Sequence, residues 1–295
     1  MANTRVLVRR RKAVRNTRKI TKTMERISTA KLAKAQNAAL AARPYAAKLA
    51  ELAAAAAAAA GQIRHPLLEA HAQPKNALVI VLTSDRGLCG AFNANIIKQA
   101  RTLIASLKNE GRQLQFIVQG KKGVGAFRFL KLPLAERLIG VSDKPSYARA
   151  EALAEKLIAA YAKHELDEVF IVYSAFKVGG QQVAKQERIL PLAGTAGAQD
   201  KKAPKAEKPA QDILFHPDPK TILEGTLPLV VKMAIFKAML ENAASEQAAR
   251  RVAMKNATDS ADEMILSLTR AYNRARQGKI TSEIAEIVGG ANALE

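Results

Sequence analysis

Apolar and small side chains recur every three or four residues through the last third of the chain. The spacing predicts one long helix over residues 219–288, roughly 100 Å in length, packed along a coiled-coil seam. The positions that keep this spacing are Met233, Phe236, Leu240, Ala243, Gln247, Arg250, Met254, Ala257, Ala261, Met264, Leu268, Ala271 and Ala275. Gln247 and Arg250 are poor core residues. We therefore expect something other than a plain two-helix core to contact them.

The first sixty residues carry a second helical pattern. Ala13, Thr17, Ile20, Met24 and Ile27 follow 4-3-4-3 spacing, which predicts a seam. The spacing then slips and resumes from Leu32 through Ala53. We expect one helix over residues 3–59, roughly 85 Å long, kinked but not ended at Pro44.

The middle of the chain changes period. ALVIVLT (77–83), QLQFIVQ (113–119) and DEVFIVYS (167–174) predict short buried strands, with helices around 93–108 and 146–164 between them. This alternation predicts a small, mostly parallel sheet with right-handed crossovers. The Ala-, Gly-, Pro- and Lys-rich residues 193–211 predict a mobile loop, and DILFHPD (212–218) predicts a further short strand.

These patterns predict an α/β protein in which the two terminal helices form a long antiparallel coiled coil beside a Rossmann-like sheet domain. The expected division is a shaft helix over 1–60, a central α/β domain over 61–218, and a second shaft helix over 219–295. An ordinary dimerising coiled coil between two chains is the structural alternative.

The formal net charge of +21 points to an acidic partner, which could be nucleic acid, an anionic membrane surface or an acidic protein. Residues 1–34 hold twelve Lys or Arg and one acidic residue, so about half of the net charge lies there. Cys89 is the only cysteine, which rules out an intrachain disulfide and indicates a reducing compartment. No run of about 18 apolar residues predicts a membrane span.

Two glycine-containing segments follow predicted strands, where phosphate-binding turns are found. In TSDRGLCGAFN (83–93), Gly87 and Gly90 match neither GxGxxG nor a P-loop, and QGKKGVGAF (119–127) also departs from both. Both segments predict tight strand-to-helix connections. The four histidines show no metal-ligand spacing and no catalytic arrangement stands out. We therefore expect no catalytic residues, cofactor or metal.

Several segments, taken in order, resemble the gamma subunits of F-type ATP synthases, the central rotor shafts of those complexes. They are KITKTMERISTAKLAKAQ (19–36), ARPY (42–45), TSDRGLCGAFNANI (83–96), FHPDP (215–219), SEQAARRVAMKNATD (245–259) and YNRARQGKITSEIAEIVGGA (272–291). The resemblance covers nearly the whole chain, and the last segment fits the family's C-terminal signature.

The resemblance implies that the shaft is clasped by a hexamer of alternating alpha and beta subunits, with the catalytic sites on beta. It implies that loops of beta contact the shaft, and that an apolar tip turns inside a sleeve. The implied contacts with beta loops are Met24, Arg250, Arg276, Gln277, Thr281 and Glu283, and the implied tip residues are Ile284, Ile287 and Val288.

The resemblance further implies one copy per complex, bound to an epsilon subunit and a membrane ring of c subunits. It places the complex on the cytoplasmic face of a bacterial plasma membrane, where proton flow drives rotation. Two other functions stay open from the residues alone. One is a basic coiled-coil protein that binds nucleic acid, and the other is a nucleotide-dependent α/β enzyme that uses Gly87 and Gly90.

Overall fold

The computed structural model describes residues 4–59, 65–71, 73–143, 145–176, 181–192 and 218–292. The chain divides into two units. We call residues 30–249 the sheet unit, and we call residues 4–29 together with 250–292 the helix-pair unit. Two long helices, α1 (Thr4–Ala59) and α5 (Pro219–Asn292), supply residues to both units. The predicted strand at 212–218 and the predicted loop at 193–211 lie outside the described residues, except for Asp218.

The sheet unit is built on a five-stranded sheet with strand order β3-β2-β1-β4-β5. Neighbouring pairs among the first four strands are parallel, and β5 runs antiparallel to β4. The strands are β1 (Asn76–Leu82), β2 (Gln113–Gln119), β3 (Glu136–Leu138), β4 (Glu168–Phe176) and β5 (Gln182–Leu190). The three predicted strands are β1, β2 and β4, and the mostly parallel sheet that they were expected to form is confirmed.

Alternate residues of β1 pack into two separate apolar cores, as expected for a central strand covered on both faces. Leu78, Ile80 and Leu82 belong to one core, and Ala77, Val79 and Val81 belong to the other. Ile80 pairs with Ile117 of β2 and with Ile171 of β4, so three isoleucines lie side by side across the sheet.

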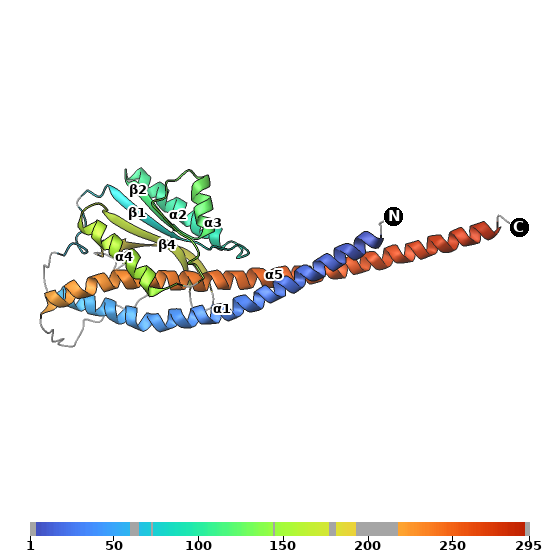
Figure 1. The fold of residues 1–295 in the computed structure, drawn as a ribbon, viewed down its shortest axis with the longest axis horizontal. Helices are drawn as coiled ribbons and strands as arrows, with labels where there is room; N and C mark the ends of the chain where they lie inside the picture. Colours follow the sequence, from blue (N-terminus) through green and yellow to red (C-terminus); the bar gives the residue numbers. More distant parts are fainter. Residues whose placement is uncertain are drawn as a thin grey trace. The chain divides into compact units, whose positions relative to one another are not determined.

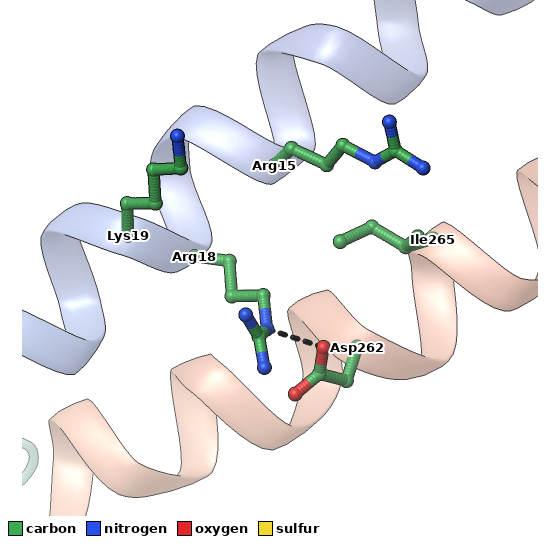
Figure 2. A pocket seen from close by; sticks show the side chains of 5 residues that line it. All are labelled: Arg15, Arg18, Lys19, Asp262 and Ile265. Atoms are coloured by element: carbon green, nitrogen blue, oxygen red, sulfur yellow. Dashed lines mark ion pairs between the residues drawn. The ribbon is translucent and has the colours of Figure 1, made fainter.

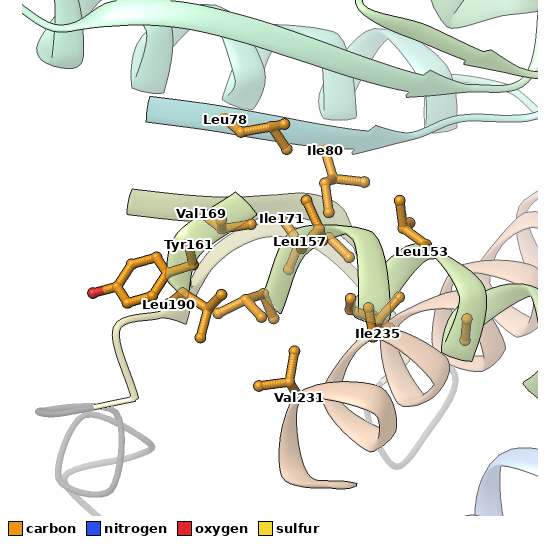
Figure 3. Close-up of a cluster of buried hydrophobic side chains, with 14 of the residues drawn as sticks. Leu78, Ile80, Leu153, Leu157, Tyr161, Val169, Ile171, Leu190, Val231 and Ile235 are labelled. Carbon is orange, nitrogen blue, oxygen red and sulfur yellow. The ribbon is translucent and has the colours of Figure 1, made fainter. Parts of the chain in front are cut away.

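Each face of the sheet is covered by its own helices (Figure 1). The core that contains Ile80 lies against α4 (Tyr147–Ala162) and α5, with Leu157 and Ile235 among the contributing residues (Figure 3). The opposite core lies against α2 (Phe92–Asn109) and α3 (Lys121–Phe129), which contribute Ile96 and Phe127. The part of α5 before Arg250 is therefore an integral part of the sheet unit.

α5 is buried on every side from Ala238 to Arg250. This includes Gln247, whose side-chain amide donates to Oδ1 of Asp143 at 3.4 Å. Oδ2 of the same carboxylate lies 2.9 Å from Nζ of Lys31 on α1. The polar residue that interrupts the predicted seam therefore has partners within the sheet unit itself.

Candidate functional site

The carboxyl edge of the sheet, where the parallel strands end, is the usual position of a ligand site in this kind of fold. In open α/β sheets, ligands bind where the chain leaves neighbouring strands in opposite directions, which here is between β1 and β4. Residues of α5 lie at this edge: Asn242 accepts a hydrogen bond from the backbone N–H of Ser174, near the end of β4, and the Ser245 hydroxyl donates to the Ser174 carbonyl. The usual ligand position is therefore contacted by the protein's own helix.

The connection from β1 to α2 is held together by its own side chains. The Ser84 hydroxyl donates to the Arg86 carbonyl at 2.6 Å, and the Asn93 side-chain amide donates to Ser84 Oγ at 2.8 Å. Leu88 and Gly90 both adopt positive φ, and Cys89 is buried beneath them. These contacts describe a tight strand-to-helix connection, the interpretation that the glycine spacing favoured.

Asp85 occupies the position at α3 where an anion would bind. Its carboxylate accepts hydrogen bonds from the backbone N–H of Lys121, the first residue of α3, at 3.1 Å and from that of Gly140 at 3.0 Å. Ser142 adds a hydroxyl donor at 3.1 Å. The N-terminus of a helix attracts negative charge, and here the chain supplies that charge. Asp85 therefore joins three connections at the carboxyl edge.

The hydrogen bonds that Asp85 accepts also set its protonation. Burial alone would raise the pKa of Asp85, but the backbone N–H groups of Gly140, Lys121 and Ser142, together with the Ser142 hydroxyl, outweigh burial and lower the pKa below its usual value of 3.8. The Asp85 carboxylate is therefore ionised at neutral pH.

We expect Asp85→Asn to lower the free energy of unfolding by about 2 kcal/mol at pH 7, because an amide cannot accept all of these bonds. A depressed folded-state pKa gives stability that is complete above the unfolded-state pKa and is lost as the pH falls through the folded-state value. Urea unfolding from pH 7 down to about pH 3 should therefore show the difference between the two proteins shrink below about pH 4. Asp259→Asn, at an exposed position of α5, serves as the control. A difference that stays constant with pH would contradict this role.

The histidines form no metal site in the part of the chain that the structure describes. Nδ1 of His71 lies 2.5 Å from Oδ1 of Asp167, and the His71 ring stacks on Tyr161. Oδ2 of Asp167 accepts the backbone N–H groups of Lys75 and Asn76, each at 2.7 Å. The Asp167 carboxylate thus ties the start of β1 to the start of β4, which is a structural role.

The helix-pair unit is an antiparallel pair of helices. The Thr258 hydroxyl donates to the Thr21 hydroxyl at 2.8 Å. Further along, Arg18 forms an ion pair with Asp262, and the Arg11 guanidinium lies 5.1 Å from the centre of the Tyr272 ring. Partner positions therefore rise along α1 as they fall along α5, which confirms the expected antiparallel pairing.

The seam predicted for the start of α1 is wrong by one position. Ile20 and Ile27 are 60% and 52% exposed, whereas Thr21 and Ser28 are buried. The buried and half-buried positions from Thr4 to Leu32 are Thr4, Leu7, Arg11, Val14, Thr21, Met24, Glu25, Ser28 and Leu32. Of the predicted seam positions only Met24 is among them, and the spacing that leads from Thr21 to Leu32 shows no slip. The seam at this end mixes polar and apolar residues, and both isoleucines of the predicted seam face outward.

A shallow positive hollow lies between the two helices (Figure 2). Its volume is about 250 Å³, and its lining residues are Arg15, Arg18, Lys19, Asp262 and Ile265. The Asp262 carboxylate pairs with Arg18, so three cations surround one anion. The arrangement can attract an acidic side chain and contains no nucleophile or general base for chemistry.

The residues expected to contact beta loops differ in how exposed they are. Arg276, Gln277, Thr281 and Glu283 are exposed, Met24 is half-buried, and the Arg250 side chain is only 6% exposed. The Thr281 hydroxyl donates to the Gln277 carbonyl, and Glu283 pairs with Lys279 at 3.3 Å. The Thr281 and Glu283 side chains are therefore oriented by their own helix, and all four exposed residues are accessible to a partner.

The end of α5 extends beyond its helical partner. Arg11 lies against Tyr272 and α1 begins at Thr4, so from Ile280 onward α5 has no described residue of α1 beside it. The three expected tip residues are exposed, with Ile287 at 71%. An amphipathic helix end with uncovered isoleucines is typical of a segment that packs against another protein.

Sequence reasoning missed the residues that hold the helix pair together. These are Arg11, Arg18, Thr21, Thr258, Asp262 and Tyr272. Each of the three residues on α1 contacts one of the three on α5. The two residue numbers of each contacting pair add up to nearly the same value, which is expected for antiparallel helices. Polar positions carry this signal, and apolar periodicity does not contain it.

We expect the double variant Thr21→Cys, Thr258→Cys to form a disulfide within one chain on mild oxidation, because the two hydroxyls lie 2.8 Å apart. Non-reducing gel electrophoresis of the full chain, with mass spectrometry of the linked peptides, measures it. Ile20→Cys with Thr258→Cys should not link, since Ile20 faces away from the seam. Links formed mainly between two chains would instead indicate a homodimeric coiled coil.

Comparison with known proteins gives consistent matches. A family model described as ATP synthase matches residues 3–294. An ATP synthase gamma chain from Gemmatimonas aurantiaca is 43% identical over 100% of both chains. Among solved structures, a chain of the Euglena gracilis mitochondrial ATP synthase (OSCP/F1/c-ring) has a TM-score of 0.65 at 20% identity, covering 99% of this chain and 94% of that one. A chain of the Tetrahymena thermophila ATP synthase central stalk/c-ring has a TM-score of 0.58 at 23% identity, covering 81% and 99%. The two structural matches establish the shared fold.

Proposed function

The chain belongs to the ATP synthase gamma-chain family, and we propose that it is the rotating shaft that couples a membrane ring of c subunits to catalytic sites on beta subunits. It is a non-catalytic, central-stalk subunit of the ATP synthase complex. None of its described helices is long and apolar enough to cross a membrane, which suits a subunit attached to the membrane through its complex. The observation that carries the proposal is the antiparallel helix pair whose longer member, α5, continues uncovered past the start of α1.

Rotation would work through contacts that change with angle. An asymmetric shaft contacts three equivalent beta subunits differently, so each rotor angle favours a different conformation at each site. Such a shift requires contact energies that differ between the conformations. Arg276, Gln277, Thr281 and Glu283 are exposed on α5 and can form such contacts with beta loops.

We propose that Met24 and Arg250 also contact beta subunits. The two residues differ in how accessible they are to such a contact. Met24 is half-buried and lies near exposed basic residues of α1, so it can touch an acidic segment of beta. Arg250 is 6% exposed, so its guanidinium reaches a beta loop only if that loop approaches closely or the side chain turns outward.

The end of α5 is proposed to turn inside an apolar sleeve formed by the alpha and beta subunits. Ile284, Ile287 and Val288 are exposed on this end, and burying them in a sleeve would remove apolar surface from water. Apolar contacts are not directional, so they can support a rotating tip without fixing its angle.

The proposed partners are therefore the alpha and beta hexamer, one epsilon subunit and the c ring, with one copy of this chain per complex. Because the matched gamma chain comes from a bacterium, we place the complex on the cytoplasmic face of a bacterial plasma membrane. We propose protons as the coupling ion. The net charge of +21 is then directed at acidic protein surfaces.

The two other functions are less well supported. A nucleotide-dependent enzyme would need the switch point between β1 and β4, which α5 contacts through Asn242 and Ser245. A nucleic-acid-binding protein would need a continuous basic face, but Arg11 and Arg18 of the basic segment are engaged by Tyr272 and Asp262 of α5.

The test is expression of the tagged chain in cells whose own gamma chain has been deleted. We expect alpha, beta and epsilon subunits to co-purify with it, and we expect membranes to regain ATP-driven proton pumping. The purified chain alone should hydrolyse no ATP. Retained binding to nucleic acid with no associated subunits, or ATP turnover by the isolated chain that disappears in Gly87 or Gly90 variants, would overturn the proposal.

A further inference from the structure

The end of β4 is bound by a helix where a strand would normally lie. The ladder between β1 and β4 ends at Val81 and Val172, while β4 continues to Phe176. The Ser174 N–H donates to Oδ1 of Asn242 at 3.1 Å, and the Ser174 carbonyl accepts from the Ser245 hydroxyl at 2.9 Å. Two side chains one helical turn apart thus satisfy both backbone groups of one strand residue.

This contact is fully enclosed. Asn242, Ser245 and Ser174 are all buried, so water cannot readily replace either bond. Breaking one would leave a buried polar group without a partner, which is costly. The two bonds are therefore persistent features of the sheet unit.

Further polar contacts surround the pair. The Tyr173 hydroxyl donates to Oε2 of Glu187 at 3.0 Å, and Glu241 of α5 also lies beside this hydroxyl. Burial first, and then the charges of Glu187 and Glu241, raise the pKa of Tyr173, so the phenol remains a donor. Lys185 pairs with Glu187. Glu241 of α5 and Glu187 of β5 therefore both lie at the Tyr173 hydroxyl, next to the Ser174 contact.

The two hydrogen bonds to Ser174 depend on direction, and the contacts of the apolar core do not. Apolar packing resists separation of α5 from the sheet, and the free energy of burying apolar surface does not depend on the direction of a bond. Hydrogen bonds weaken steeply as their geometry departs from linear. Any turn of α5 relative to the sheet would move Asn242 and Ser245 away from Ser174 together.

We propose that Asn242 and Ser245 are positioning residues that lock α5 to the sheet unit against rotation, so that torque passes between them. This rests on the proposed function, in which the sheet unit is driven by the c ring. α5 is a single helix from Pro219 to Asn292, so torque received at Ser174 is carried along it to the residues that face the beta subunits.

The local geometry is tested by hydrogen exchange on the full-length chain. Asn242→Leu should speed exchange at the Ser174 amide about tenfold, because its acceptor is removed. Thr226→Val is the matched control: it also removes a buried hydroxyl from α5, but that hydroxyl donates to the Ile222 carbonyl of the same helix, not to the sheet residue Ser174. Exchange at Ser174 should be unchanged in the control.

The coupling role is tested in assembled ATP synthase complexes. We expect Ser245→Ala, and more strongly Ser245→Ala with Asn242→Leu, to lose proton pumping per ATP hydrolysed while hydrolysis continues. Ser245→Thr keeps the hydroxyl and should keep the pumping ratio, as should Thr226→Val. In single-molecule measurements with α5 held in the hexamer, a probe on the sheet unit should show a broader angular distribution in the loss variants.

The outcomes separate the two proposals. If the wild-type chain restores pumping but the Ser245→Ala variant keeps a normal pumping ratio and angular distribution, the lock is wrong and the rotor function stands. If the double variant does not assemble, the pumping ratio and the angular distribution of the Ser245→Ala variant alone decide whether the lock exists. If the wild-type chain itself restores no pumping, the proposed function fails and the lock fails with it.

Discussion

Replacing Gly120 by alanine is expected to lower the free energy of unfolding by about 3 kcal/mol. Gly120 lies between β2 and α3 with φ of +91°, a region that residues with a side chain rarely adopt. A Cβ placed there would lie 2.4 Å from the Thr83 carbonyl oxygen and 2.7 Å from that of Ser84. Both atoms belong to the backbone, so they cannot rotate away, and the connection that positions Asp85 would have to deform.

Urea unfolding of the full chain, followed by circular dichroism, measures this loss. The control is Gly125→Ala, within α3, where a Cβ would have no neighbour within 4 Å. Alanine favours helix, so the control should be unchanged or more stable by up to about 1 kcal/mol. Equal effects of the two substitutions would show that the close approach of Gly120 to Thr83 does not constrain the fold.

The sheet unit could be predicted from the sequence because its signals are local. β1, β2 and β4 are short apolar runs followed by turn residues, which is the pattern of strands covered on both faces. β5 is not predicted because it lies at the edge of the described sheet, beside β4, and its apolar residues are interrupted by charged ones such as Lys185 and Glu187. β3 was missed because three residues give no periodicity.

The seam at the start of α1 could not be placed correctly because polar residues share it with apolar ones. The search for 4-3-4-3 apolar spacing selected Ile20 and Ile27, yet the structure turns these outward and packs Thr21 and Ser28 inward. Thr21 is buried because it accepts a hydrogen bond from Thr258, 237 residues away in the sequence. Hydrophobic periodicity contains no information about such a pairing.

The contacts of α5 with the carboxyl edge were beyond sequence reasoning for the same reason. Gln247 was noticed as a poor core residue, and its partner Asp143 could be identified only from the fold. Asn242 and Ser245 lie in a helical pattern that gives no sign of Ser174. The expected contacts with beta loops depend on other chains, so they stay predictions.

Arg276→Ala and Gln277→Leu are expected to slow ATP hydrolysis and proton pumping by assembled complexes at least about tenfold, with normal assembly. Both side chains are exposed near the end of the helix pair, where α5 is about to extend beyond α1. If each bonds a beta loop at some rotor angles only, its loss changes the energy of those angles and so the barrier between them. Breaking a desolvated charge-assisted bond at an interface costs about 2–5 kcal/mol.

These two positions test the rotor contacts more cleanly than Arg250 does. The Arg250 side chain is buried within this chain, so Arg250→Ala would change the stability of the subunit and its function together. Arg276 and Gln277 are exposed, and a substitution there should change stability by no more than about 0.5 kcal/mol. Arg274→Ala removes another exposed guanidinium from the same helix and is the control.

Turnover and the pumping ratio should be measured in parallel with the melting temperature of the isolated chain. Slowed turnover at unchanged melting temperature, with Arg274→Ala normal, would locate the contacts at Arg276 and Gln277. Wild-type rates in both variants would show that the beta loops do not depend on these side chains.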